Sequence, residues 1–130
     1  MNSDRALEER RSRRSTDPLV ALHYQLASTR TDGELDAIVV ADVSGVVVAG
    51  AGSWAACEEL AAYAPFFEED VEAGASASVS HRVSTLRGEV EVRRLCLGSS
   101  DVLVCARGGA ARRASLERAV AGVTRILRAA

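Results

Sequence analysis

The sequence has no lysine, no C-x-x-C pair and few aromatic residues, namely one Trp, two Tyr and two Phe in 130 residues. Without lysine, the Gly-Lys-Ser/Thr end of a phosphate-binding P-loop is missing. Gly45, Gly50 and Gly52 lie in a hairpin pattern and form no dinucleotide-binding fingerprint. The three cysteines predict neither a disulfide framework nor a zinc site, so we expect small buried thiols in a reducing compartment.

A dominant charge of one sign is also missing. The 16 basic residues, all Arg, and the 18 acidic residues leave a net charge of −2, so no overall field attracts nucleic acid or anionic lipid. Residues 1–16 are rich in Arg and contain no apolar run, which predicts a flexible charged tail and no signal peptide or membrane span. We expect residues 17–130 to form one cytoplasmic domain, with no nucleic-acid partner and no membrane insertion.

The first half of this domain carries clear boundary signals. After Asp17-Pro18, a pair suited to a helix N-terminus, apolar residues recur at helical spacing until Asp32-Gly33. Residues 36–42 have the sequence DAIVVAD, an apolar and β-branched run typical of a central strand. The turn sequence Asp42-Val43-Ser44-Gly45 leads into a return strand at 46–49, which predicts a β-hairpin.

A second helix is predicted after the hairpin. Ser53 is a good N-cap, and Pro65 should end this helix at Ala64, because proline removes a backbone donor and clashes with the preceding turn. Residues 71–80 are small and polar without a sustained period, and we expect them to be mainly loop.

Three antiparallel strands are predicted next, at 81–87, 89–97 and 102–107, and a helix over 116–127 closes the domain. The apolar strand 102–107 should lie beside 36–42 in the centre of the sheet, and residue 97 should lie opposite residue 102. The more polar strand 81–87 suits an edge.

No set of residues indicates catalysis or a bound metal. Ser80, His81 and Asp101 could serve as nucleophile, base and orienting acid, but their spacing does not bring them together. His23 has no second ligand at metal spacing, and a packed or rim histidine is expected. The acidic residues Glu68, Glu69, Asp70 and Glu72 lack the glycine turn of a calcium loop. We therefore expect no enzyme activity, no catalytic or metal-binding residue and no cofactor.

Residues 41–49 combine an aliphatic strand, an aspartate, a glycine turn and a Val-Ala return strand. With the Ala-rich helix at 58–64 and the strand at 103–106, this pattern resembles the roadblock (dynein light chain) domain family of prokaryotic type, and the resemblance covers residues 19–127. It implies a profilin-like roadblock fold of the α/β (α+β layered) class. The implied architecture is a five-stranded antiparallel sheet with helices on both faces, in the order αββαβββα.

The resemblance also implies pairing through the second helix and the edge strand that follows it. On a helical wheel, Trp54, Ala61 and Pro65 form an apolar stripe beside the sheet-facing one, which a single helix packed on a sheet does not need. The alternative is that Trp54 only covers its own hairpin. The stripe predicts that Ala61→Glu yields a monomer. The predicted dimer interface is Trp54, Glu58, Ala61, Ala62, Pro65, His81, Val83 and Thr85.

For function, the resemblance implies a non-enzymatic dimeric regulator or scaffold that binds a Ras-like small GTPase or its signalling or motility complex. Its partners would be a second copy of the chain, or another roadblock protein, and the GTPase. Two alternatives stay open: a profilin-like sensor domain for a small molecule, which would need a concave pocket with convergent polar groups, and a purely structural adaptor without a GTPase partner.

Overall fold

The computed structural model describes residues 17–69, 77–98 and 100–130. The predicted tail at 1–16 and most of the predicted loop at 71–80 lie outside these residues. The elements are α2 (Pro18–Gly33), β1 (Ala37–Asp42), β2 (Val47–Ala51), α3 (Trp54–Glu69), α4 (Ala77–Arg87), β3 (Val90–Cys96), β4 (Asp101–Arg107) and α5 (Arg112–Ala129).

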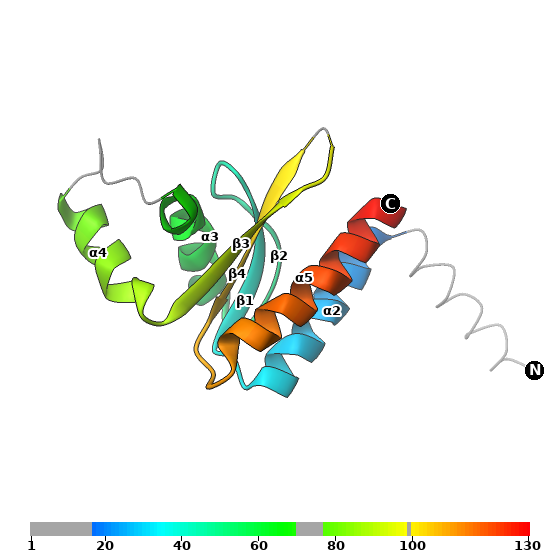
Figure 1. The fold of residues 1–130 in the computed structure, drawn as a ribbon, viewed down its shortest axis with the longest axis horizontal. Helices are drawn as coiled ribbons and strands as arrows, with labels where there is room; N and C mark the ends of the chain where they lie inside the picture. Colours follow the sequence, from blue (N-terminus) through cyan, green and yellow to red (C-terminus); the bar gives the residue numbers. More distant parts are fainter. Residues whose placement is uncertain (1–16, 70–76, 99) are drawn as a thin grey trace, which may run out of the picture.

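The four described strands form one antiparallel sheet in the order β2-β1-β4-β3. As predicted, β1 and β4 lie side by side in its centre, with Val39 opposite Cys105. Helices α3 and α4 cover one face of the sheet and α2 and α5 cover the other (Figure 1). The predicted layers, with helices on both faces of an antiparallel sheet, are therefore present.

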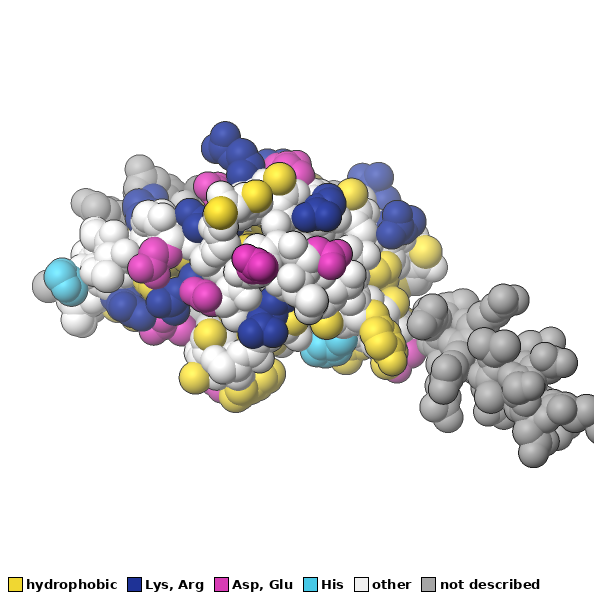
Figure 2. Space-filling model, turned by 90° about the horizontal axis from the view of Figure 1, so that it is seen from below, with side chains coloured by type: hydrophobic (Ala, Val, Ile, Leu, Met, Phe, Trp, Pro, Cys, Tyr) yellow, Lys and Arg dark blue, Asp and Glu magenta, His cyan; other side chains and the backbone are white. Residues whose placement is uncertain are grey.

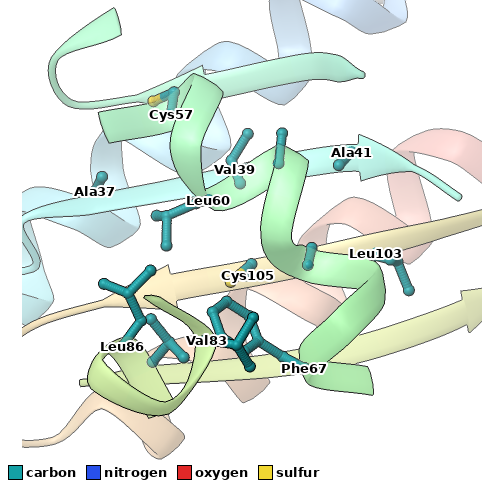
Figure 3. Packing of buried hydrophobic residues seen from close by; sticks show 13 residues of the cluster. Ala37, Val39, Ala41, Cys57, Leu60, Phe67, Val83, Leu86, Leu103 and Cys105 are labelled. Atoms are coloured by element: carbon teal, nitrogen blue, oxygen red, sulfur yellow. The ribbon is translucent and has the colours of Figure 1, made fainter. Parts of the chain in front are cut away.

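Successive residues of the central strands serve opposite cores, because strand side chains alternate between the two faces. Ala37, Val39 and Ala41 of β1 face α3 and α4 (Figure 3), whereas Ile38 and Val40 face α2 and α5. Because the alternating side chains of β1 are buried on both faces of the sheet, all its residues from Ala37 to Ala41 are apolar. The α3 and α4 side adds Cys57, Leu60, Ala61, Ala64, Phe67, Val83, Leu86, Val90, Leu103 and Cys105; the other side adds Leu22, Leu26, Leu35, Ala49, Leu95, Val104, Ala106, Leu116, Ala119 and Val123.

The predicted start of the first helix and the predicted hairpin are confirmed. Asp17 caps α2 by accepting hydrogen bonds from the N–H groups of Leu19 and Val20, and Pro18 occupies its first turn. In the β1–β2 turn, Asp42 Oδ1 accepts hydrogen bonds from the Ser44 N–H at 2.9 Å, the Ser44 hydroxyl at 2.6 Å and the Val46 N–H at 3.0 Å. The bond from the Ser44 hydroxyl, followed by that from Val46, lowers the pKa of the Asp42 carboxyl.

The predicted edge strand at 81–87 is wrong, because these residues belong to helix α4 (Ala77–Arg87). The described part of the sheet has four strands and not five, and the described elements follow the order αββααββα. Residues 77–80, which were predicted to be loop, also belong to α4. Helical geometry turns Val83 and Leu86, three residues apart, to one side, where both are buried beside Phe67 (Figure 3).

The predicted end of the second helix at Ala64 is also wrong. Helix α3 runs through Pro65 to Glu69, with Pro65 inside it. Continuing the helix brings Phe67 into the core with 8% of its surface exposed. Burial of this aromatic ring offsets the backbone hydrogen bond that Pro65 cannot make.

The β3–β4 register differs from the expected one by two residues. Leu95 lies opposite Val102 and Cys96 opposite Asp101, where residue 97 was expected opposite 102. Cys57 and Cys105 are buried as predicted, whereas Cys96 is exposed near the end of the hairpin, and all three thiols are free. Burial raises the pKa of the Cys105 thiol to about 12 and also raises that of Cys57.

Candidate interaction surface

An open groove of about 330 Å³ runs between the β1–β2 hairpin and α3. Among the described residues that line it, Glu58 is charged, and Trp54, with 67% of its surface exposed, and Val46, with 59%, are large exposed hydrophobic residues. We call it the Trp54 groove. The residues that line it are Gly45, Val46, Val47, Trp54, Glu58 and Ala62.

Close contact between the hairpin and α3 positions this groove. Gly45 has φ +93°, and a Cβ there would lie 3.3 Å from the carbonyl oxygen of Ala61, so the turn rests directly on the α3 backbone. At the other end, Gly50 packs against Cys57. As predicted, Ser53 caps α3, since its Oγ accepts a hydrogen bond from the Ala56 N–H at 3.2 Å.

The predicted interface residues on α3 divide between surface and core. Trp54, Glu58 and Ala62, at positions i, i+4 and i+8, share one side of α3 and line the groove. Pro65 is half-buried. Ala61 is fully buried, because the sheet and the hairpin turn cover it, so the stripe drawn from Trp54 through Ala61 was misplaced by one residue.

The three predicted interface residues beyond α3 lie on α4 and not on a strand. Val83 is buried, with 6% of its surface exposed. His81 and Thr85 are exposed one helical turn apart, and the Thr85 hydroxyl donates a hydrogen bond to the His81 carbonyl oxygen at 2.9 Å. Val46 is an exposed residue of the Trp54 groove that the sequence analysis did not predict. Its position just after the turn glycine was the available signal, because hairpin tips are usually exposed.

An ion-pair network holds α4 against α3 and the sheet. Glu59 accepts from Arg82 with Oε1 2.6 Å from Nη2, and Nη1 of Arg107 lies 3.6 Å from the same oxygen. Nε of Arg107 also lies 3.3 Å from Glu89. The hydrogen bond that Arg82 donates to Glu59 is the main reason that the pKa of Arg82 is raised. These pairs are partly exposed, so their contribution is to orientation more than to stability.

A second open groove lies between the β1–β2 turn and the β3–β4 turn, with a volume of about 520 Å³. Its charged groups already have partners: Asp42 accepts hydrogen bonds from the backbone of its own turn, and Arg94 Nη2 lies 3.1 Å from Asp101. A small-molecule site would need polar groups that converge on open space. The sensor alternative therefore gains no support from the described residues.

The nominated catalytic residues are not brought together. Ser80 and His81 lie on α4, which leads into the Val90 end of β3, whereas Asp101 lies opposite Cys96 at the other end of that hairpin. His23 Nδ1 lies 3.2 Å from the carbonyl oxygen of Gly50 on the edge strand β2, and the imidazole is exposed, so His23 is a histidine at the rim of the sheet and not a packed one. Within residues 17–69, 77–98 and 100–130, no three His, Cys, Asp or Glu side chains gather as metal ligands.

The chain matches no protein-family model, and no curated protein matches it. Among solved structures it is similar to MglB of Myxococcus xanthus, with a TM-score of 0.49 and 13% identity over 85% of this chain and 90% of that one. In the described part of the chain, no helix combines the length and the apolar character needed to cross a membrane.

Proposed function

We propose that the chain is a non-enzymatic adaptor that self-associates through the Trp54 groove and binds a Ras-like small GTPase. The observation that carries the proposal is the exposure of Trp54 beside Val46 in an apolar groove. An indole in water is a typical anchor of a protein interface, because its burial removes a large apolar area from solvent. The alternative that Trp54 only covers its own hairpin is disfavoured by its 67% exposure.

Three features of the groove support a second copy as its occupant. The small side chain of Ala62 lies two helical turns from Trp54 and leaves room for another helix to approach. Among the described residues of the lining, Glu58 alone is charged, so this surface is largely apolar. The exposed side chains of Trp54 and Val46 give two apolar anchors that a symmetric contact would use twice.

The GTPase as client is supported by the resemblance of residues 41–49, 58–64 and 103–106 to the roadblock family. The absence of lysine agrees with a protein that binds a GTPase and is not one itself. Arg82, Arg87, Arg93 and Arg94 are candidates for an arginine finger by charge alone. Three of them, Arg82, Arg93 and Arg94, are engaged with Glu59, Glu117 and Asp101. We therefore propose binding of the GTPase and not stimulation of its hydrolysis.

The mass of the protein in solution tests self-association. Light scattering should show a dimer for the native chain, and Trp54→Ala should raise the dissociation constant about tenfold, the loss typical of a central aromatic anchor. Tyr24→Ala removes an exposed aromatic residue from the opposite layer and should leave the mass unchanged. A native chain that remains monomeric at high micromolar concentration would refute the dimer.

Affinity capture tests the client. The native chain should retain a Ras-like GTPase from its own genome, supplied as purified protein loaded with GDP or with a non-hydrolysable GTP analogue. GTP turnover measured with and without the chain then separates binding from stimulation. If no such GTPase binds in either nucleotide state, the GTPase proposal fails, and the purely structural adaptor takes its place.

A further inference from the structure

Helices α2 and α5 form a second outer surface, on the face of the sheet opposite α3. They run antiparallel, because Gly122 lies against Gln25 and Gly33 lies against Ser115. The C-terminal half of α5 therefore lies beside the N-terminal half of α2, and α5 ends at the side of the molecule where α2 begins (Figure 1).

The outer side of α5 is basic. Arg118, Arg125 and Arg128 are exposed and lie on one side of α5. Residues 118–130 and residues 18–31 contain no acidic side chain. Glu117 on the same helix is paired with Arg93 of β3, and Asp17 accepts hydrogen bonds from the first turn of α2. None of the ion pairs between described residues involves Arg118, Arg125 or Arg128.

Apolar side chains lie exposed beside these arginines on α2. Tyr24 has 63% of its surface exposed, Leu19 47% and Val20 38%. Val20 and Tyr24 are four residues apart and share the outer side of the helix. Figure 2 shows basic and hydrophobic side chains near the right-hand end of the described part of the molecule, the side at which α5 ends in Figure 1. Exposed aliphatic and tyrosyl groups flanked by arginine are typical of surfaces that contact a lipid interface.

The sequence just before α2 has the same character. Arg10, Arg11, Arg13 and Arg14 precede Asp17 within seven residues, so further positive charge is covalently attached to this end. A cluster of basic residues next to an apolar contact is the pattern that anionic lipid headgroups attract. The net charge of −2 does not oppose this, because charges further away than about 8 Å are screened at physiological salt.

We propose that the surface formed by Leu19, Val20, Tyr24, Arg118, Arg125 and Arg128 binds the anionic headgroups of a membrane surface peripherally. Nucleic acid would use the arginines but leave the exposed aliphatic groups without a contact, whereas a lipid interface accepts both. Because α3 lies on the other side of the sheet, the Trp54 groove faces away from the membrane and stays accessible to a partner. The inference does not depend on the identity of that partner.

Sedimentation of the full chain with lipid vesicles tests the proposal. The chain should bind vesicles of phosphatidylcholine with about 30% phosphatidylserine, an anionic surface that attracts basic residues, and should not bind phosphatidylcholine alone. Arg125→Gln should lower the partition coefficient about fivefold, the factor for one basic residue at such a surface. Val20→Ser with Tyr24→Ser should lower it about tenfold by removing the apolar contact.

Arg113→Gln is the matched control, because it makes the same change at the opposite end of α5 and should alter the partition coefficient by no more than about twofold. Equal losses for Arg113→Gln and Arg125→Gln, or equal binding to both kinds of vesicle, would overturn the proposal. So would binding that is lost when Arg10, Arg11, Arg13 and Arg14 become Gln but is unaffected by Arg125→Gln. Displacement from vesicles by a random-sequence oligonucleotide that binds more tightly would assign the surface to nucleic acid instead.

Discussion

Arg82 of α4 donates two hydrogen bonds to the carboxylate of Glu59 on α3, with Nη2 2.6 Å from Oε1 and Nε 3.3 Å from Oε2. This paired contact, with the burial of Val83 and Leu86, determines where α4 lies on the sheet. Glu59 also contacts Arg107 of β4, so one carboxylate joins two helices and a strand. A helix held by few contacts opens locally more easily than the core does.

We expect Arg82→Gln to loosen α4 without unfolding the domain, because the pair is partly exposed and the two buried side chains remain. Amide hydrogen exchange in α4 should become about threefold faster, while β1 and β4 keep their protection. His81→Gln, at an exposed position of the same helix, serves as the control. Unchanged exchange in α4 would show that packing alone holds this helix.

Ala61 and Ala62 provide a test of which side of α3 is on the surface. Ala61→Glu would place a carboxylate at a position with no exposed surface, so we expect a loss of about 3 kcal/mol or more in unfolding free energy and a poorly folded chain. Ala62→Glu should leave the melting temperature nearly unchanged and weaken self-association, since Ala62 is exposed in the Trp54 groove. Calorimetry and light scattering distinguish the two. A stable and still dimeric Ala62→Glu protein would show that the dimer interface does not include the Trp54 groove.

Pro65→Ala should stabilise the protein. Alanine supplies the N–H that Pro65 lacks, and its acceptor in a regular helix is the carbonyl of Ala61. Part of this gain is offset because alanine is freer than proline in the unfolded chain, which leaves about 1 kcal/mol. Thermal unfolding at low protein concentration measures the change. A lower melting temperature would mean that contacts of the proline ring outweigh the missing hydrogen bond.

The three thiols should differ in reactivity. Cys96 is exposed, whereas Cys57 and Cys105 are buried and burial raises the pKa of both. Because the thiolate is the reactive form, a thiol reagent at pH 8 should label Cys96 rapidly and the other two only after unfolding. Titration with a chromogenic disulfide reagent counts the reactive groups, and Cys96→Ser should abolish the fast phase. Rapid labelling of Cys105 would show that the sheet centre opens.

Asp42 should stabilise the β1–β2 turn in a pH-dependent way. Its pKa is lowered in the folded chain by the hydrogen bonds from Ser44 and Val46, so its contribution is complete above pH of about 4 and is lost as the pH falls through the lowered pKa. Asp42→Ala should cost about 1 kcal/mol at neutral pH. Asp42→Asn keeps an acceptor oxygen, so it should cost less and remove the pH dependence. Denaturant titrations at pH 7 and pH 3 compare the three proteins.

The start of α2 and the β1–β2 hairpin were predictable because their signals are local. Asp17 with Pro18, and the turn Asp42-Val43-Ser44-Gly45, satisfy nearby backbone groups whatever surrounds them. The central position of β1 and β4 was predictable for a different reason. A strand that is apolar on both faces must be covered on both.

Only the tertiary structure decided the state of residues 81–87. Val83 and Thr85 suit a strand by propensity and by alternation. In the folded chain, a helix places both Val83 and Leu86 beside Phe67, which the continuation of α3 through Pro65 brings into the core. The free energy gained by burying these side chains is larger than the difference in β-propensity between residue types, which spans about 1 kcal/mol. The spacing of 83 and 86 was the available signal, but one such pair also fits an irregular strand.

The choice between Ala61 and Ala62 as the surface residue was likewise tertiary. A helical wheel separates neighbouring residues by about 100°, but it does not show how much of the helix circumference is covered. Here the sheet covers one side of α3 and the Gly45 turn rests on Ala61. The exposed residues along α3 beside the hairpin are therefore Trp54, Glu58 and Ala62. The sequence by itself determined the hairpin and the central strands, which are apolar and must be covered on both faces. It also determined that Trp54 lies outside the sheet-facing side of its helix. Only the tertiary structure decided which residues lie beside Trp54 on the surface, because the burial of a residue depends on neighbours that are distant in the chain.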